Sequence, residues 1–129
     1  MNFLLNTHAL LWALSGSERL TRPTRDILTD PHNGVFVSAA SAWEIAIKVG
    51  LGKLDILPDV ASWLPGELAT VRLTPLPITG AHALAVERLP PFHTDPFDRL
   101  LIAQANAEEL TLVSCDRQIE RFDVRLLRC

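Results

Sequence analysis

The segment HTDPFDRLLIAQA, residues 93–105, combines the start of a helix with two carboxylates. Asp95 is a favourable N-cap residue, and Pro96 suits the first helical position, where its missing N–H group is not needed. Because the chain from 100 to 107 is almost wholly apolar, this helix is expected to pack on most of its sides. It would therefore hold the carboxylates of Asp95 and Asp98 in place at its solvent-facing start.

Length and composition predict a single globular domain over residues 1–129. A chain of 129 residues can bury about two-thirds of its unfolded surface, and its 48% hydrophobic and 21% charged residues are typical of a folded protein. The net charge of −3 does not indicate a protein that holds nucleic acid by overall charge, although arginines near the C-terminus leave a local basic patch open. No apolar run approaches the roughly 18 residues of a membrane span, and Asn6 and Thr7 interrupt the N-terminal one. We therefore expect a cytoplasmic protein.

Two cysteines, Cys115 and Cys129, are present, and their spacing does not resemble that of a metal site. In a reducing cytosol cysteines are normally free. We therefore expect both to be free thiols.

Predicted strands and helices alternate along the chain. Apolar runs predict strands at residues 1–5, 35–37, 110–114 and 124–127, while 71–78 is expected to be an edge strand because it contains two prolines. Helical patterns occur at 9–14, 22–29, 42–49, 60–64, 79–88 and from 96 to about 109; Pro65-Gly66 should break or bend the fourth of these helices. In the connector 50–58, Leu51, Leu54, Ile56 and Leu57 are expected to cover the core. This order predicts an α/β fold with a mainly parallel central sheet flanked by helices.

Polar side chains follow the predicted strands at the points where helices begin. Ligands of open α/β sheets bind outside the carboxyl ends of the strands, so these side chains are expected to meet at one edge. The first strand supplies Asn6 and Thr7, the second supplies Ser38, Ser41 and Glu44, the segment quoted above supplies Asp95 and Asp98, and the fourth supplies Ser114 and Asp116.

Such a set suits Mg²⁺ or Mn²⁺, which prefer carboxylate and water oxygens. No histidine–cysteine cluster indicates zinc, and no glycine-rich phosphate loop indicates an NTPase. A structural alternative is that the acids only cap helices, since Ser41-x-x-Glu44 has the form of a capping box. Glu44 and Lys48 are also spaced as a surface ion pair.

Three segments together resemble the PIN-domain family, in particular its VapC-type toxins of VapBC toxin–antitoxin pairs. They are LLNTHALLW at 4–12, SAWEIAIK at 41–48 and HTDPFDRLLIAQA at 93–105, and LVSCD at 112–116 matches a looser final motif. The resemblance covers essentially the whole chain and implies a PIN-like three-layer fold. It further implies a Mg²⁺- or Mn²⁺-dependent endoribonuclease in which water activated by the metal hydrolyses RNA phosphodiesters.

The same resemblance assigns roles to individual residues. It implies catalytic, metal-binding acids at Glu44, Asp98 and Asp116, with position 6 as the fourth metal ligand. It implies accessory roles for Thr7, Asp95, Ser114 and Arg99, where Arg99 contacts phosphate or holds an acid. Family members usually form homodimers, and a small antitoxin silences them by inserting its tail into the acidic groove.

Position 6 departs from the family pattern, because the first strand normally ends in Asp and here it is followed by Asn6. Asn keeps a carbonyl oxygen but lacks the negative charge that offsets the cation. We therefore expect weakened metal binding and impaired RNA cleavage. A natural degenerate member and an inactivating substitution in a toxic protein both remain open explanations.

Two other functions fit parts of the pattern. The first is a catalytically dead PIN-fold module that binds an antitoxin or RNA. The second is a phospho-acceptor receiver domain, which is disfavoured because that fold needs adjacent acids after its first strand and a lysine after its last.

Overall fold

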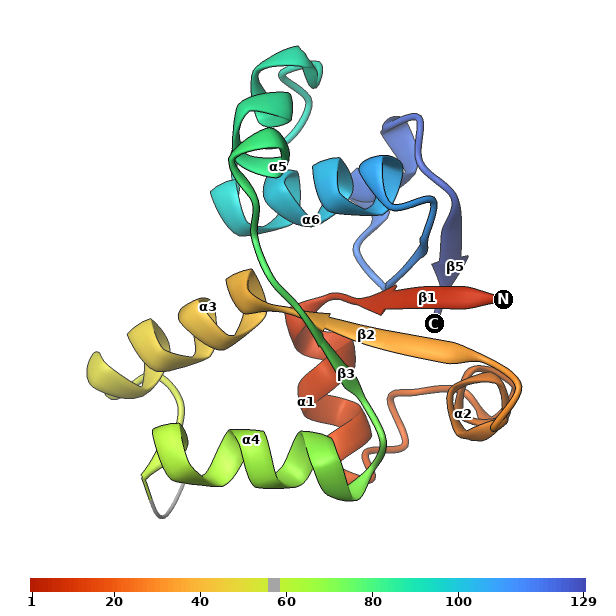
Figure 1. The fold of residues 1–129 in the computed structure, drawn as a ribbon, viewed down its shortest axis with the longest axis vertical. Helices are drawn as coiled ribbons and strands as arrows, with labels where there is room; N and C mark the ends of the chain where they lie inside the picture. The colour runs from red at the N-terminus through yellow and green to blue at the C-terminus, as the bar shows by residue number, and fades with distance from the viewer. Residues whose placement is uncertain (56–58) are drawn as a thin grey trace.

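The computed structural model describes residues 1–55 and 59–129, and its elements alternate as the sequence predicts (Figure 1). The strands are β1 (Asn2–Leu5), β2 (Gly34–Ser38), β3 (Thr74–Leu76), β4 (Thr111–Ser114) and β5 (Leu126–Arg128). The α-helices are α1 (Thr7–Ser15), α2 (Arg22–Thr29), α3 (Ala39–Gly50), α4 (Val60–Thr70), α5 (Gly80–Ala85) and α6 (Pro96–Ala107). Two 3₁₀ helices complete them, η1 (Val86–Arg88) and η2 (Arg117–Arg121).

The five strands form one sheet in the order β3-β2-β1-β4-β5, and every neighbouring pair is parallel. The chain runs outward from β1 through β2 to β3, crosses back to β4 on the other side of β1, and finishes at β5. The connection from β1 to β2 and the connection from β3 to β4 therefore lead to opposite sides of β1. This reversal makes the position between β1 and β4 a topological switch point. The predicted parallel α/β fold is confirmed.

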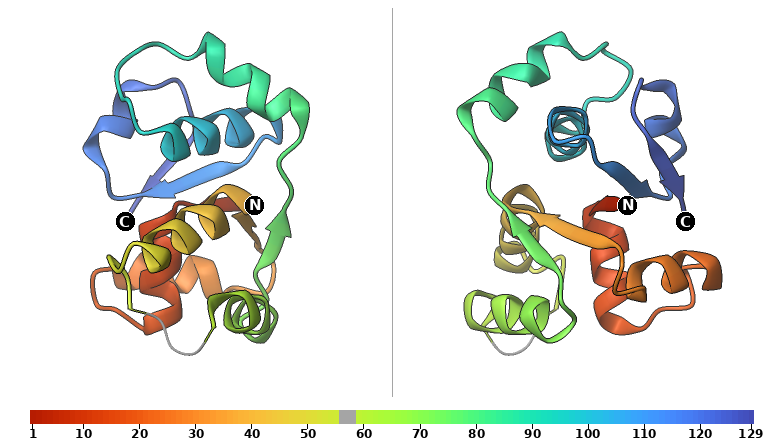
Figure 2. Two further views of the ribbon diagram at one scale, coloured as in Figure 1. Left: turned by 90° about the vertical axis from the view of Figure 1, so that its left-hand side faces the viewer. Right: turned by 45° about the vertical axis from the view of Figure 1, so that its right-hand side comes forward.

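Side chains of the central strands alternate between two cores, one on each face of the sheet. Phe3 and Leu5 pack with residues of α1, α3 and α4, whereas Leu4 packs with Leu101 and Ile102 of α6. Figure 2 shows the resulting three layers, with α5 and α6 on one side of the sheet and α1, α2 and α4 on the other. Phe3, Leu4 and Leu5 of β1 are buried between the two cores, which accounts for the apolar run in this strand.

Three local predictions from the connector and α4 have different outcomes. Helix α4 continues through Pro65 to Thr70, so the predicted break is wrong; Leu64 and Leu68 on either side of the proline are buried and hold the helix against the core. Leu54 packs on the core as expected, but Leu51 is 64% exposed because it follows the end of α3. The predictions for residues 56 and 57 lie outside the described residues.

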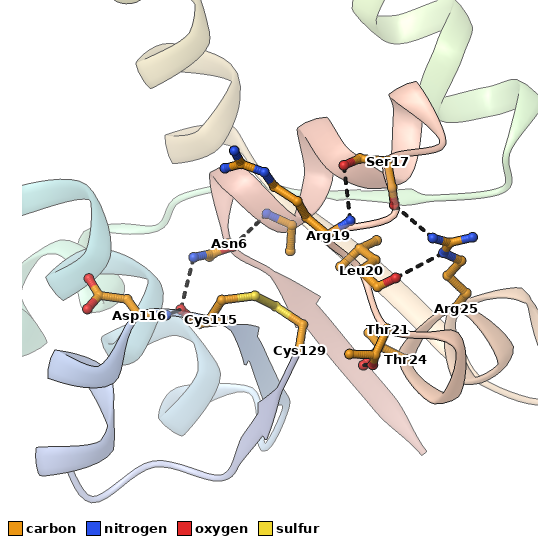
Figure 3. Close-up of a disulfide and its surroundings, with 12 residues drawn as sticks. Asn6, Ser17, Arg19, Leu20, Thr21, Thr24, Arg25, Cys115, Asp116 and Cys129 are labelled. Atoms are coloured by element: carbon orange, nitrogen blue, oxygen red, sulfur yellow. Dashed lines mark hydrogen bonds between the residues drawn. A yellow bond between two sulfur atoms is a disulfide. The ribbon is translucent and has the colours of Figure 1, made fainter.

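The predicted free thiols are wrong, because Cys115 and Cys129 form a disulfide (Figure 3). Strands β4 and β5 pair in parallel with Ser114 opposite Arg128. The residues that follow them, Cys115 and Cys129, therefore also lie side by side. The resulting separation of 5.1 Å between the two Cα atoms suits a disulfide. The bond fixes the segment that leads directly into Asp116.

Within residues 1–55 and 59–129, none of the helices combines the length and apolar character required to span a bilayer.

Candidate functional site

The carboxyl ends of β1 and β4 lie side by side at the switch point, and each is followed by polar residues. Asn6 is 5% exposed and Ser114 is fully buried, and the Asn6 amide nitrogen donates a hydrogen bond of 3.0 Å to the Ser114 hydroxyl. Figure 3 shows Asn6 and Asp116 on neighbouring segments close to the disulfide. The structure thus brings together Asn6 and Ser114, two polar positions predicted from the sequence that are 108 residues apart in the chain.

Both polar atoms of the Asn6 side chain are used within the protein. Its Oδ1 accepts a hydrogen bond of 2.8 Å from the backbone N–H of Ala9 and so caps α1. This bond fixes the amide orientation, because the NH₂ group can only donate hydrogen bonds and could not accept one from the Ala9 N–H. Nδ2 therefore faces Ser114, and residue 6 directs a donor rather than an oxygen toward β4.

Glu44 projects from α3 and is almost fully buried, at 6% exposure. Its Oε1 accepts a hydrogen bond of 2.6 Å from Thr7 Oγ1, and its Oε2 lies 2.7 Å from Lys48 Nζ. The predicted ion pair with Lys48 is therefore present, but the carboxylate is buried rather than on the surface. The proposed capping box is wrong, because α3 begins at Ala39 and Ser38 caps it by accepting from Ala40 N–H.

Asp98 and Asp116 share one neighbour, the imidazole of His93. His93 Nε2 lies 2.8 Å from Asp98 Oδ2 and 3.6 Å from Asp116 Oδ2. The backbone of Asp116 is fixed to the end of β4, because its N–H donates a hydrogen bond of 3.1 Å to Ser114 Oγ. The fixed loop after β4 and the first turn of α6 therefore converge on a single point at the carboxyl edge.

Negative charge concentrates at this point. Burial raises the pKa of the Asp98 carboxyl above its ordinary value, and the charges of Asp95 and Glu44 act in the same direction, whereas His93 opposes them. For His93, burial lowers the pKa, but its hydrogen bond to Asp98 and the surrounding acids outweigh burial and raise it. A cation at this edge would relieve the repulsion between the acids.

The two remaining accessory residues have structural positions. Asp95 caps α6, because its Oδ1 accepts from the N–H groups of Phe97 and Asp98 at 2.9 and 3.2 Å. The Arg99 guanidinium contacts no acid within hydrogen-bonding distance in the described chain; instead it donates to four carbonyls of the segment before α6. These are the carbonyls of Val86, Leu89, Pro90 and His93, at 2.8 to 3.3 Å.

His93 is the residue that sequence reasoning missed, although it lies inside the decisive segment. The sequence feature that could have indicated it is its position just before the helix start at Asp95-Pro96, five residues before Asp98. A helix start turns the chain, so residues on both sides of it can meet. Nothing in the sequence showed that the loop before Asp95 folds back over the acids.

The donor set matches a hard divalent cation better than a soft one. Among the described residues, the ligand atoms that lie within 4.8 Å of one another belong to His93, Asp98 and Asp116. Glu44 is not in that group; it bonds to Thr7 and Lys48, and its charge acts on Asp98 from a greater distance. Carboxylate oxygens suit Mg²⁺ and Mn²⁺. Asn6 fits such a cation poorly, because it carries no negative charge and its oxygen already caps α1.

Comparisons with known proteins agree with this architecture. A family model described as PIN domain matches residues 3–125. A segment of 59 residues is 44% identical to Ribonuclease VapC16 of Mycobacterium tuberculosis (strain ATCC 25618 / H37Rv) and covers 46% of this chain and 42% of that protein. The match therefore spans less than half the length of that relative.

Two solved structures share the fold over nearly the whole chain. VapBC2 from Rickettsia felis, bound to a DNA fragment from its promoter, gives a TM-score of 0.75 at 19% identity, covering 99% of this chain and 98% of that one. DNA-bound VapBC from Salmonella typhimurium gives a TM-score of 0.72 at 14% identity with the same coverage.

Proposed function

The chain belongs to the PIN-domain family, and from that premise we propose that it is a divalent-metal-dependent endoribonuclease, the toxin of a toxin–antitoxin pair. The observation that carries the proposal is the convergence of Asp98 and Asp116, with Glu44 nearby, at the carboxyl edge beside the switch point. The partial match to a relative named a ribonuclease supports RNA as the substrate.

Glu44, Asp98 and Asp116 are the residues that would hold the metal ion, with Asn6 as a weakened fourth position. When bound, such a divalent cation would polarise a phosphate group and lower the pKa of a water molecule. The protein's own contribution is to fix the acids: Thr7 orients the Glu44 carboxylate, and Ser114 orients the backbone that leads to Asp116.

Hydrolysis without a covalent enzyme intermediate fits the hydroxyls of the site. Thr7 Oγ1 lies within hydrogen-bonding distance of Glu44 and Ser41, and Ser114 Oγ accepts from Asn6 and from the Asp116 N–H. In the part of the chain that the structure describes, neither hydroxyl is paired with a histidine base, as an activated nucleophile would be. Water is therefore the proposed nucleophile.

We attribute a reduced activity to Asn6. The missing negative charge weakens attraction for the cation, and the carbonyl oxygen that could replace it already caps α1. Restoring the acid is expected to raise both metal affinity and RNA cleavage.

The proposed partners are a small antitoxin and a second copy of the chain, and the proposed location is the cytoplasm. Helix α3 carries exposed apolar side chains at four-residue intervals: Trp43 is 59%, Ile47 38% and Leu51, just beyond the helix, 64% exposed. Side chains at this spacing share one face of a helix, and such a patch supports a protein-binding surface. The VapBC complexes among the structural neighbours support an antitoxin as a partner.

RNA cleavage by the purified chain tests the proposal. Single-stranded RNA is incubated with Mn²⁺ or Mg²⁺, with and without EDTA, using the parent chain and the Asn6→Asp variant. Cleavage is expected to require the metal, to be faster in the variant, and to disappear when Asp98→Asn is added to it. Asp123→Asn, at an exposed aspartate outside the site, is the matched control and should leave cleavage unchanged.

Cleavage that survives EDTA or Asp98→Asn would overturn the proposed mechanism. If no form cleaves RNA but the chain still captures a co-expressed antitoxin, the chain is a binding module rather than an enzyme.

A further inference from the structure

The imidazole of His93 occupies the place between two acids where a cation would be expected. Its Nε2 atom and carboxylate oxygens of Asp98 and Asp116 all lie within 4.8 Å of one another, close enough to contact one ion. The side chains of His93 and Asp98 are only 12% and 18% exposed, and that of Asp116 is 36% exposed. The group therefore combines one nitrogen donor with two oxygen donors in a largely enclosed position.

The backbone around His93 is built to keep the ring there. Arg99 donates hydrogen bonds to the His93 carbonyl at 3.2 Å and to the Pro90 carbonyl at 2.8 Å, and its other guanidinium nitrogen binds the carbonyls of Val86 and Leu89. Arg99 belongs to α6, the helix that also carries Asp98. The loop that presents the imidazole and the helix that presents the carboxylate are thus fixed to each other.

We propose that His93 Nε2 is an additional metal ligand and that it makes the site prefer first-row transition ions, such as Mn²⁺ and Co²⁺, over Mg²⁺. This inference rests on the proposed metal site and specifies the ion. Imidazole nitrogen binds transition ions well, whereas Mg²⁺ strongly prefers oxygen donors. Metal binding would release the proton that Nε2 shares with the Asp98 carboxylate, and His93 and Asp98 would both serve as ligands.

The missing charge at Asn6 bears on this preference. Binding of Mg²⁺ by carboxylates depends mainly on charge, and the site has lost one negative charge at position 6. A nitrogen donor compensates a transition ion for that loss but does little for Mg²⁺. The missing charge at Asn6 weakens the binding of either ion, and the His93 nitrogen offsets that loss for the transition ion only.

The rival explanation is that His93 only neutralises Asp98 and Asp116. In that case a metal ion must displace the ring, and removing the ring would strengthen the binding of every divalent cation. The two explanations thus predict opposite changes for the same substitution.

Isothermal titration of the metal-free chain with MgCl₂, MnCl₂ and CoCl₂ distinguishes them, with His93→Gln as the test variant. Gln can still donate to Asp98 but lacks the imidazole nitrogen. The parent chain is expected to bind Co²⁺ and Mn²⁺ more tightly than Mg²⁺. His93→Gln should lose about tenfold or more in affinity for Co²⁺, while its Mg²⁺ affinity changes little. The visible absorption of bound Co²⁺ should also shift, because a nitrogen ligand is lost.

The matched control is His32→Gln, because His32 also contacts an aspartate, Asp30, at 3.0 Å but is 92% exposed and lies outside the acidic site. It should leave all three affinities unchanged, and thermal unfolding in EDTA verifies that both variants fold. Unchanged Co²⁺ affinity in His93→Gln, or tighter binding of Mg²⁺, would overturn the inference.

Asp98→Asn separates this inference from the proposed function. If Asp98→Asn abolishes binding of all three ions and His93→Gln changes the preference, the metal site stands even if no RNA is cleaved. If Asp98→Asn leaves binding intact, the ions bind elsewhere and both proposals fail.

Discussion

Replacing Asn6 by Asp is expected to strengthen divalent-metal binding without loss of a hydrogen bond. In the structure Asn6 Oδ1 accepts from Ala9 N–H at 2.8 Å and Nδ2 donates to Ser114 Oγ at 3.0 Å. A carboxylate keeps the first bond, and its second oxygen can accept from the Ser114 hydroxyl instead of donating to it. The substitution therefore adds one negative charge at a buried position and leaves the local geometry satisfied.

The size of the effect follows from Coulomb's law. At an effective dielectric constant of about 20, two unit charges 4 Å apart interact by about 4 kcal/mol, and a divalent ion doubles this figure. Desolvation of the new carboxylate and its repulsion from Asp98 and Asp116 offset much of the gain. A net gain of about 1.5 to 4 kcal/mol is expected, which corresponds to binding that is roughly tenfold to a thousandfold tighter.

Isothermal titration of the metal-free proteins with Mn²⁺ measures this gain directly. Asn2→Asp is the matched control, because it makes the same change in charge at the exposed opposite end of β1. A dissociation constant for Asn6→Asp within about twofold of the parent value would refute the reasoning, as would an equal gain in the control.

Three further predictions concern stability. Arg99→Lys should lower the free energy of unfolding in urea by about 2 to 4 kcal/mol, because lysine cannot reproduce four carbonyl hydrogen bonds from one planar group; an unchanged midpoint would contradict the assigned role. Reducing the disulfide between Cys115 and Cys129, 14 residues apart in the sequence, should lower that free energy by about 3 kcal/mol, and equal urea midpoints with and without reductant would argue against the bond in solution. Without metal, stability should fall as pH rises through 6.5 and beyond, because the folded pKa of His93 is raised above that ordinary value and its stabilising contribution is complete only below it. The raised pKa of Asp98 also makes stability fall as pH rises, but at lower pH, since the folded chain again holds the proton more tightly than the unfolded chain. Thermal unfolding in EDTA as a function of pH measures this effect, and stability should depend less on pH in His93→Gln.

The parts of the fold set by local pattern were predictable from the sequence. The alternation of apolar strands with helices gave the parallel sheet, and the two prolines placed β3 at its edge. Asp95 and Pro96 marked the start of α6 because capping is a local interaction. Asn6 was likewise identified as the weak position of the acidic set.

The parts that depend on packing between distant segments were not predictable. The core contacts of Leu64 and Leu68 carry α4 across Pro65, and no local rule contains them. The disulfide follows from the register of β4 against β5, which the sequence alone does not specify.

The same limit applies to the site. Arg99 donates hydrogen bonds to four carbonyls of a loop that folds back over α6, and that loop places His93 between Asp98 and Asp116. An arginine next to a conspicuous acid suggests a role in chemistry when only the sequence is known, because its tertiary partners are not visible.

The most direct test of the acidic edge as a single metal centre is the anomalous scattering of Mn²⁺ in crystals of the chain soaked with that ion. One strong peak is predicted beside Asp98 and Asp116, with carboxylate oxygens at roughly 2.0–2.6 Å and the His93 imidazole among the ligands. A crystal in which Mn²⁺ binds elsewhere, or leaves His93 bridging the two aspartates undisturbed, would contradict the account.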